Sequence, residues 1–98
     1  MSQSDLLRFR GGGVASTSAP ATPTTAIAIP QYARGAVISL TGNARIGVTS
    51  GAATFAPDAT NLGYVDAGAH TIVRHQADTH LHIAGDGAAV TFKIAWVE

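Results

Sequence analysis

The chain has 98 residues, which is enough for one domain and too few for two. Its apolar fraction of 46% includes 19 alanines with little surface to bury, and the absence of cysteine excludes disulfides and thiolate metal sites. Six basic and six acidic side chains give zero net charge, unlike the basic excess of nucleic-acid binders, and no apolar run approaches the roughly 20 residues of a membrane span.

The first 25 residues differ in composition from the rest of the chain. Leu6, Leu7 and Phe9 precede a run that begins with three glycines and continues with Ala, Ser, Thr and Pro. Such a run is flexible at its glycines, extended at its prolines and has little to bury. We predict a flexible N-terminal arm over residues 1–25 in which Leu6, Leu7 and Phe9 bind a partner; the alternative is a frayed terminus without a role.

Residues 26–98 are predicted to form an all-β domain. Short β-branched runs alternate with turn residues every 8–12 positions, which favours an antiparallel β-sandwich, and we expect one of the jelly-roll type. The strands are expected, in chain order, at residues 25–29, 36–40, 45–49, 62–65, 71–75, 79–84 and 89–97. Alternation in the last strand predicts that the core face carries Val90, Phe92, Ile94 and Trp96.

His80 and His82 are the candidate metal ligands, because residues two apart on a strand face the same way. They could supply part of a cupin-type site, for which the only downstream Glu is Glu98. In a trimer they could supply six nitrogens around one axis, similar to the iron site of some phage tail spikes. The alternative is that both are ordinary strand residues of intermediate burial. We expect no cofactor, with His80 and His82 as the candidates if a metal binds.

The sequence shows no pattern typical of nucleophilic catalysis. No serine lies in a Gly-x-Ser-x-Gly turn, and the three consecutive glycines lack the Lys-Ser/Thr of a phosphate loop. The aspartates at positions 58, 66, 78 and 86 are expected in turns. Arg45 and Arg74 are expected within strands, either solvated or paired with another chain. We therefore predict that the protein is not an enzyme.

From about Ile29 to Glu98 the sequence resembles a group of small bacteriophage virion proteins. The resemblance lies in residues 34–40, 44–48 and 56–60, in Asp66-Ala67-Gly68 before residues 70–74, and in residues 82–85 before the last strand. It implies a head decoration (cement) protein, a head-fibre base or a small tail component. Such proteins are β-sandwiches that form trimers or higher rings without catalytic residues, and an extended terminal arm often ties decoration proteins to neighbouring capsid subunits.

The expected function is therefore that of a structural virion protein, assembled in the host cytoplasm, which stabilises the capsid by bridging coat subunits. The expected partners are the major capsid protein and two further copies in a homo-trimer, with no nucleic acid and no membrane. The alanine-rich core and zero net charge also favour burial against other chains. The alternatives are a small trimeric tail, baseplate or fibre-attachment component and, in a different class, a cupin-like metalloenzyme.

Overall fold

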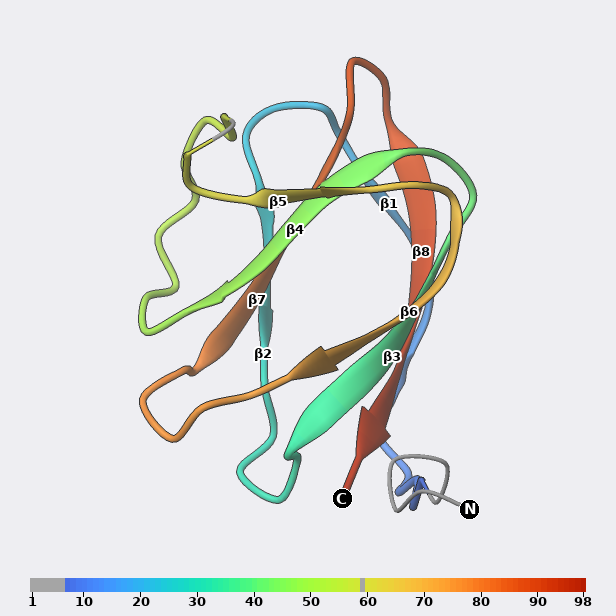
Figure 1. The fold of residues 1–98 in the computed structure, drawn as a ribbon, viewed down its shortest axis with the longest axis vertical. Helices are drawn as coiled ribbons and strands as arrows, with labels where there is room; N and C mark the ends of the chain where they lie inside the picture. Colours follow the sequence, from blue (N-terminus) through green and yellow to red (C-terminus); the bar gives the residue numbers. More distant parts are fainter. Residues whose placement is uncertain (1–6, 59) are drawn as a thin grey trace.

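The computed structural model describes residues 7–58 and 60–98, which form eight strands in two four-stranded antiparallel sheets (Figure 1). The strands are β1 (Val14–Ala19), β2 (Thr25–Ala28), β3 (Gly35–Leu40), β4 (Ala44–Thr49), β5 (Gly63–Val65), β6 (Gly68–Val73), β7 (His80–Gly85) and β8 (Val90–Val97). Sheet A has the order β1-β8-β3-β6, and sheet B has the order β2-β7-β4-β5. No helix in the described ranges is long and apolar enough to cross a membrane. The predicted all-β, sandwich-like architecture is confirmed.

Strands β2 to β8 agree with the predicted strands to within a few residues at each end. The agreement is good where one face of a strand is buried, because burial produces the alternation that the sequence displays. The largest shift is in β6, which starts at Gly68 and ends at Val73 rather than covering residues 71–75. Gly68 has φ of +120°, a backbone conformation that favours glycine and lets the strand begin directly after the turn.

Strand β1 contradicts the prediction of a flexible arm for part of residues 1–25. Val14–Ala19 pairs with β8 as an edge strand of sheet A, so these residues belong to the sandwich and the boundary at residue 25 is wrong for them. Their side chains are small and mostly exposed, and only Ala19 is buried. A strand attached mainly through its backbone hydrogen bonds needs no apolar alternation, which is why the sequence pattern resembles that of a linker.

The core lies between the sheets and is centred on β8. Val90, Phe92, Ile94 and Trp96 are all buried, as the alternation predicts, and Trp96 and Phe92 are the largest fully buried side chains. Sheet B contributes chiefly Leu81 and Ile83 from β7, Ile46 from β4 and Ile27 from β2 to the same cluster.

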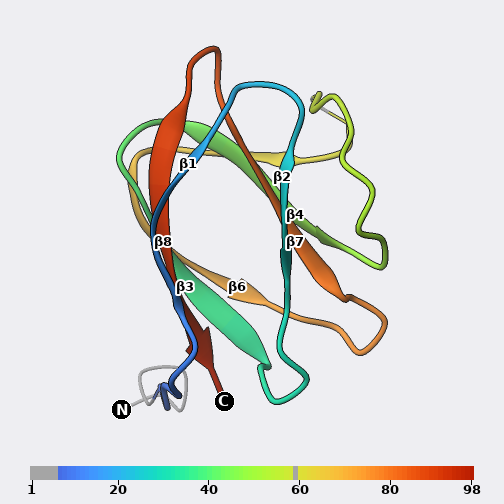
Figure 2. The same cartoon turned by 180° about the vertical axis from the view of Figure 1, so that it is seen from behind.

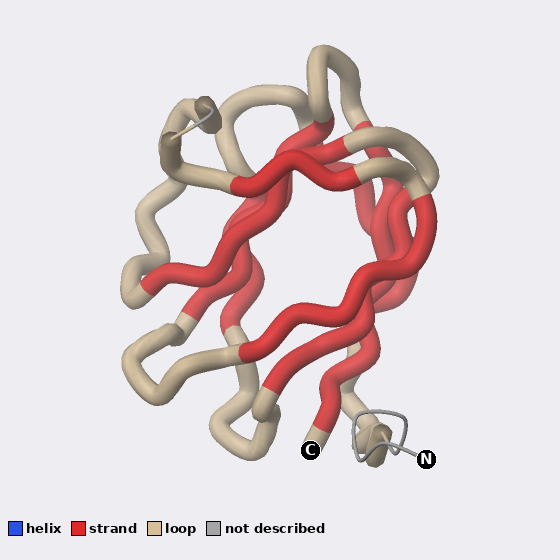
Figure 3. The backbone as a smooth tube through the Cα atoms, in the orientation of Figure 1, coloured by secondary structure: helices blue, strands red, loops and turns tan. Residues whose placement is uncertain are grey.

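The outer faces of the two sheets differ. Residues 50–58 and 60–62 fold back over sheet B, where Leu62 packs so closely on Gly47 that a β-carbon at position 47 would lie 2.7 Å from its Cδ2 atom. In the middle of sheet A, the outward-facing side chains of Ser39, Thr71 and Lys93 are exposed. Strands β1 and β2 lie along the side that Figure 2 turns toward the viewer, while β5 and β6 form the opposite side. Figure 3 shows the loops gathered at the rims of the sheets.

The substitution Trp96→Ala should lower the free energy of unfolding by about 3–5 kcal/mol, because it removes the largest buried side chain and leaves a cavity. Chemical denaturation monitored by far-UV circular dichroism would measure the change. Lys93→Ala, an exposed position on the same strand, is the matched control and should change stability by less than about 0.5 kcal/mol. Equal stability of the two variants would show that Trp96 is not a core residue.

Candidate functional site

The segment before β1 runs antiparallel beside the end of β8. Phe9 forms a β-bridge with Val97, and the Glu98 N–H donates to the Arg8 carbonyl oxygen at 2.7 Å. The Arg10 N–H also donates, at 3.4 Å, to the carbonyl oxygen of Trp96. The N-terminal and C-terminal segments therefore meet at one end of sheet A, where β1 and this segment both lie on the same side of β8.

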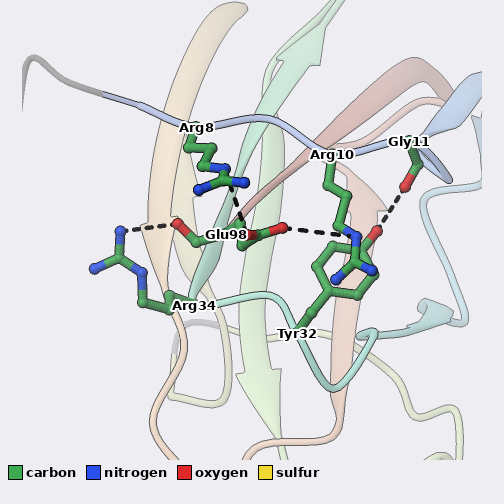
Figure 4. Close-up of polar contacts among 6 residues, drawn as sticks. All are labelled: Arg8, Arg10, Gly11, Tyr32, Arg34 and Glu98. Carbon is green, nitrogen blue, oxygen red and sulfur yellow. Dashed lines mark hydrogen bonds and ion pairs between the residues drawn. The ribbon is translucent and has the colours of Figure 1, made fainter.

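Three arginines surround Glu98 at this end (Figure 4). Arg8 Nε lies 3.4 Å from Glu98 Oε1, Arg10 Nε lies 3.6 Å from Oε2, and Arg34 Nη2 donates to the Glu98 main-chain oxygen at 2.8 Å. The Arg10 guanidinium also lies 4.5 Å from the ring centroid of Tyr32. Exposed ion pairs of this kind contribute at most about 1 kcal/mol each, so their main effect is to orient the segment and leave excess positive charge around one carboxylate.

Exposed apolar side chains lie beside this charged cluster. Phe9, Val97, Gly35 and Val73 face one another in succession across sheet A, because each is the direct neighbour of the next in the strand register. Phe9 is 53% exposed and Val73 67% exposed, while Val97 between them is buried. Leu7, in the same segment as Phe9, is 40% exposed. We call Leu7, Phe9 and Val73 the terminal patch: an exposed apolar surface next to a cationic cluster.

The terminal patch contains two of the three residues predicted to bind a partner. Leu7 and Phe9 are exposed, and Leu6 lies outside the described residues. Sequence reasoning missed Val73, which it assigned to an ordinary strand, and Arg34. No local signal could have identified them, because they reach this end of sheet A only through the pairing of β3 with β6 and β8.

His82, one of the two candidate metal ligands, is fully buried and uses both ring nitrogens within the chain. Its Nε2 atom lies 2.9 Å from the carbonyl oxygen of Gly51, and its Nδ1 atom lies 2.9 Å from the Thr24 hydroxyl oxygen. Since a carbonyl only accepts, Nε2 carries a proton, and in the neutral imidazole Nδ1 then accepts from the Thr24 hydroxyl. The Thr24 hydroxyl in turn accepts from the Phe55 N–H at 3.2 Å, and the Phe55 ring lies 4.8 Å from the His82 ring. His82 therefore fastens residues 50–55 to sheet B.

His80 lies on the same face of β7 but is not fully buried. Its Nδ1 atom lies 2.8 Å from the Thr79 hydroxyl oxygen. In the part of the chain that the structure describes, no three His, Asp or Glu side chains lie close enough together to hold a metal ion. The two histidines thus lie on one face of β7, as their spacing predicts, but His82 uses both ring nitrogens to attach the loop of residues 50–55.

The two arginines expected within strands have intrachain partners. Arg45 pairs with Asp86 at 3.6 Å, across sheet B. Arg74 follows β6, and its guanidinium donates to four main-chain carbonyl oxygens, those of residues 30, 31, 33 and 78. Arg74 therefore holds together the two loops at the Arg34 end of the sandwich.

Asp58 stabilises a turn in the loop between β4 and β5. Its Oδ1 atom accepts from the Thr60 hydroxyl, the Thr60 N–H and the Asn61 N–H. These hydrogen bonds stabilise the charged carboxylate and hold the pKa of Asp58 below its ordinary value. This is the turn role expected for the residue.

Comparison with protein-family models, with curated proteins and with solved structures finds no match to this chain.

The substitution Thr24→Val should lower the free energy of unfolding by about 1–3 kcal/mol, because it leaves His82 Nδ1 and the Phe55 N–H without their hydrogen-bond partner. Thr54→Val, at an exposed position of the same loop, is the control and should have little effect. Denaturant titration measures stability, and limited proteolysis should show faster cleavage within residues 50–58 of the Thr24 variant alone. Equal cleavage of both variants would contradict the role of His82 in fastening the loop.

Proposed function

We propose that this chain is a structural virion protein that decorates a phage capsid and stabilises it by bridging coat subunits. The observation that carries the proposal is the terminal patch, where Leu7, Phe9 and Val73 are exposed next to the arginines around Glu98. Large exposed apolar side chains bordered by charge are typical of surfaces that bind another protein. The choice of a virion as the assembly rests on the resemblance of residues 29–98 to small phage virion proteins.

The terminal patch is suited to a partner that combines apolar and acidic side chains. Its apolar members would be removed from water on docking, and the cationic cluster would favour an acidic neighbour. One standard interface buries roughly 1,600 Å² in total, and repetition over a shell adds many such contacts. The major capsid protein is the proposed partner because it presents the same surface at every lattice position.

We further infer that the sandwich is a jelly roll. The orders β1-β8-β3-β6 and β2-β7-β4-β5 put successive strands in alternate sheets, except that β4 and β5 are neighbours in sheet B, and this alternation supports an arrangement of two Greek keys. Jelly rolls occur in viral capsid domains, lectins and cupins alike, so the fold is compatible with the proposal without selecting it. The engagement of both His82 ring nitrogens within the chain favours a binding protein over a cupin-like metalloenzyme.

The alternative within the virion is a small trimeric tail, baseplate or fibre-attachment component, which could use the same terminal patch. The two locations differ in copy number: a decoration protein is present in hundreds of copies per particle and a tail component in tens or fewer. Quantitative gel densitometry of purified virions, with the major capsid protein as internal standard, should give a ratio of this chain to coat protein that corresponds to hundreds of copies per particle. A ratio below about one copy per ten coat subunits would favour the tail.

Docking should depend on Phe9. Phe9→Ser removes the aromatic ring from the terminal patch without touching the core, and should weaken binding to undecorated particles by at least tenfold, or about 1.4 kcal/mol. Tyr64→Ser is the matched control, because Tyr64 is a similarly exposed aromatic residue on β5 in the other sheet. Occupancy is measured by cosedimentation with particles. Equal occupancy of the two variants would show that the terminal patch is not the docking surface.

A substitution is a sharper test than deletion of residues 1–13. Deletion would also remove the Gly12 carbonyl, which accepts the Trp96 indole N–H at 3.2 Å, and the bridge between Phe9 and Val97. A truncated chain would therefore lose stability together with any docking function.

The homo-trimer is part of the same proposal. The small, alanine-rich core and zero net charge favour burial of further surface between copies. Multi-angle light scattering of the purified chain should give a mass that is a multiple of three protomers, and a monomer at all concentrations would contradict it.

A further inference from the structure

The outer edge of β6 is the longest regular sheet edge in the described part of the molecule. β6 pairs with β3 over six consecutive residues in unbroken register, and none of the described strands lies on its other side. The other edge strands are irregular or shorter: the register of β1 shifts between Val14 and Thr17, and β2 and β5 contain four and three residues. Proteins usually protect their sheet edges with charge, proline, bulges or short strands. β6 has none of these devices.

The backbone groups of Ala69, Thr71 and Val73 face this open side. The Thr41 N–H donates to the Thr91 carbonyl oxygen at 3.0 Å, which shows that odd-numbered residues along β3 bond to β8. The even-numbered residues of β3 therefore bond to β6, where they lie opposite even-numbered residues. Amides and carbonyls of residues 69, 71 and 73 must then point away from β3, and their side chains are exposed.

We propose that β6 pairs antiparallel with β6 of a second copy of this chain, about a two-fold axis at Thr71. In this register Thr71 faces its own copy, and Ala69 of each chain faces Val73 of the other. The hydrogen-bonded pairs in this register are all odd-numbered, so the free amides and carbonyls meet, with two hydrogen bonds for each such pair; His70 of each chain faces Ile72 of the other in the non-hydrogen-bonded pairs between them. The contact joins the two copies of sheet A into one continuous sheet.

The charges at the ends of β6 select this antiparallel arrangement. β6 contains no Asp, Glu, Lys or Arg, but Asp66 precedes it and Arg74 follows it. Antiparallel pairing brings the Asp66 end of each copy beside the Arg74 end of the other, whereas parallel pairing would bring like charges together. The facing threonines are a favourable cross-strand pair, and Val73, at 67% exposure, would be covered by the second copy. The edge is thus complementary to itself.

This contact does not rest on the proposed function, because it requires no coat protein. It uses the edge of sheet A on the side opposite β1, so it shares Val73 with the terminal patch but does not involve Phe9. A chain that pairs only through β6 is a dimer, and a trimer linked through β6 is a hexamer. Loss of the contact halves the mass in either case.

Sedimentation velocity of the full chain over a wide concentration range tests the proposal. Thr71→Lys places two like charges at the axis and should raise the dissociation constant of the contact at least tenfold, equivalent to about 1.4 kcal/mol. Thr17→Lys is the matched control, because Thr17 is an exposed threonine on β1 at the opposite edge of the same sheet. Circular dichroism confirms that both variants are folded.

Mixing variants tests the register. Thr71→Asp alone should dissociate as Thr71→Lys does, while an equimolar mixture of the two should reassociate, since opposite charges then face each other at the axis. The proposal is wrong if the wild-type chain shows, at every concentration, no species whose mass is halved by dissociation of this contact. Equal dissociation by the Thr17 variant, or a mixture that fails to reassociate, overturns it as well.

Discussion

Strand β8 is the element on which the rest of the structure depends, because it is paired along both sides and carries the core. On one side it bonds to β3, and on the other to β1 and to the segment around Phe9. Trp96 combines these functions: its ring is buried, its indole N–H donates to Gly12, and its carbonyl accepts from Arg10. A chain with so many small residues has few other places to anchor an N-terminal segment. The terminal patch exists because β8 extends far enough to hold that segment beside Glu98.

The second feature that shapes the surface is that, in the described part of the chain, the outer face of sheet B is covered by a loop and the outer face of sheet A is not. The loop between β4 and β5, in its described residues 50–58 and 60–62, covers the outer face of sheet B through the hydrogen bonds of His82 and the packing of Leu62 on Gly47. Sheet A keeps an exposed outer face of mostly small and hydroxyl-bearing side chains together with Lys93, and Phe9 and Val73 lie at one end of it. Contacts with other chains are therefore easier to build on sheet A. Both proposed contacts, with a coat subunit and with a second copy, use this sheet.

The zero net charge conceals a separation of charge along the molecule. Four arginines (Arg8, Arg10, Arg34 and Arg74) gather with two acidic residues, Glu98 and Asp78, where β3 begins, whereas Asp66 and Asp86 lie with Arg45 near its other end. Hydrogen bonds fix this arrangement: Asn43 accepts from Ala67 and from the N–H of Asp86, and Arg74 donates to the Arg34 carbonyl. The net charge of a sequence does not report such a separation, because it carries no information on which turns share an end of the sandwich. The cationic end suits an acidic docking partner.

The sequence by itself determined the all-β class, the approximate positions of seven strands and the inward face of β8. These properties are local: alternation and turn residues reflect the burial of one face, and both can be read from neighbouring positions. The sequence also identified Leu7 and Phe9 as large apolar residues in a segment that lacks others, and both are exposed. It could not find β1, since an edge strand that is attached mainly through its backbone leaves no side-chain pattern.

Only the tertiary structure decided which distant residues meet. The pairing of β3 with both β6 and β8 brings Val73 into a row with Phe9 and places Arg34 beside Glu98. The role of His82 could not be predicted from the sequence either, because its spacing from His80 is the same for a metal ligand and for a residue that fastens a loop. Its role follows from Thr24 and Gly51, which lie 58 and 31 positions away along the chain. Long-range pairing of this kind is set by the packing of whole sheets, which no local pattern encodes.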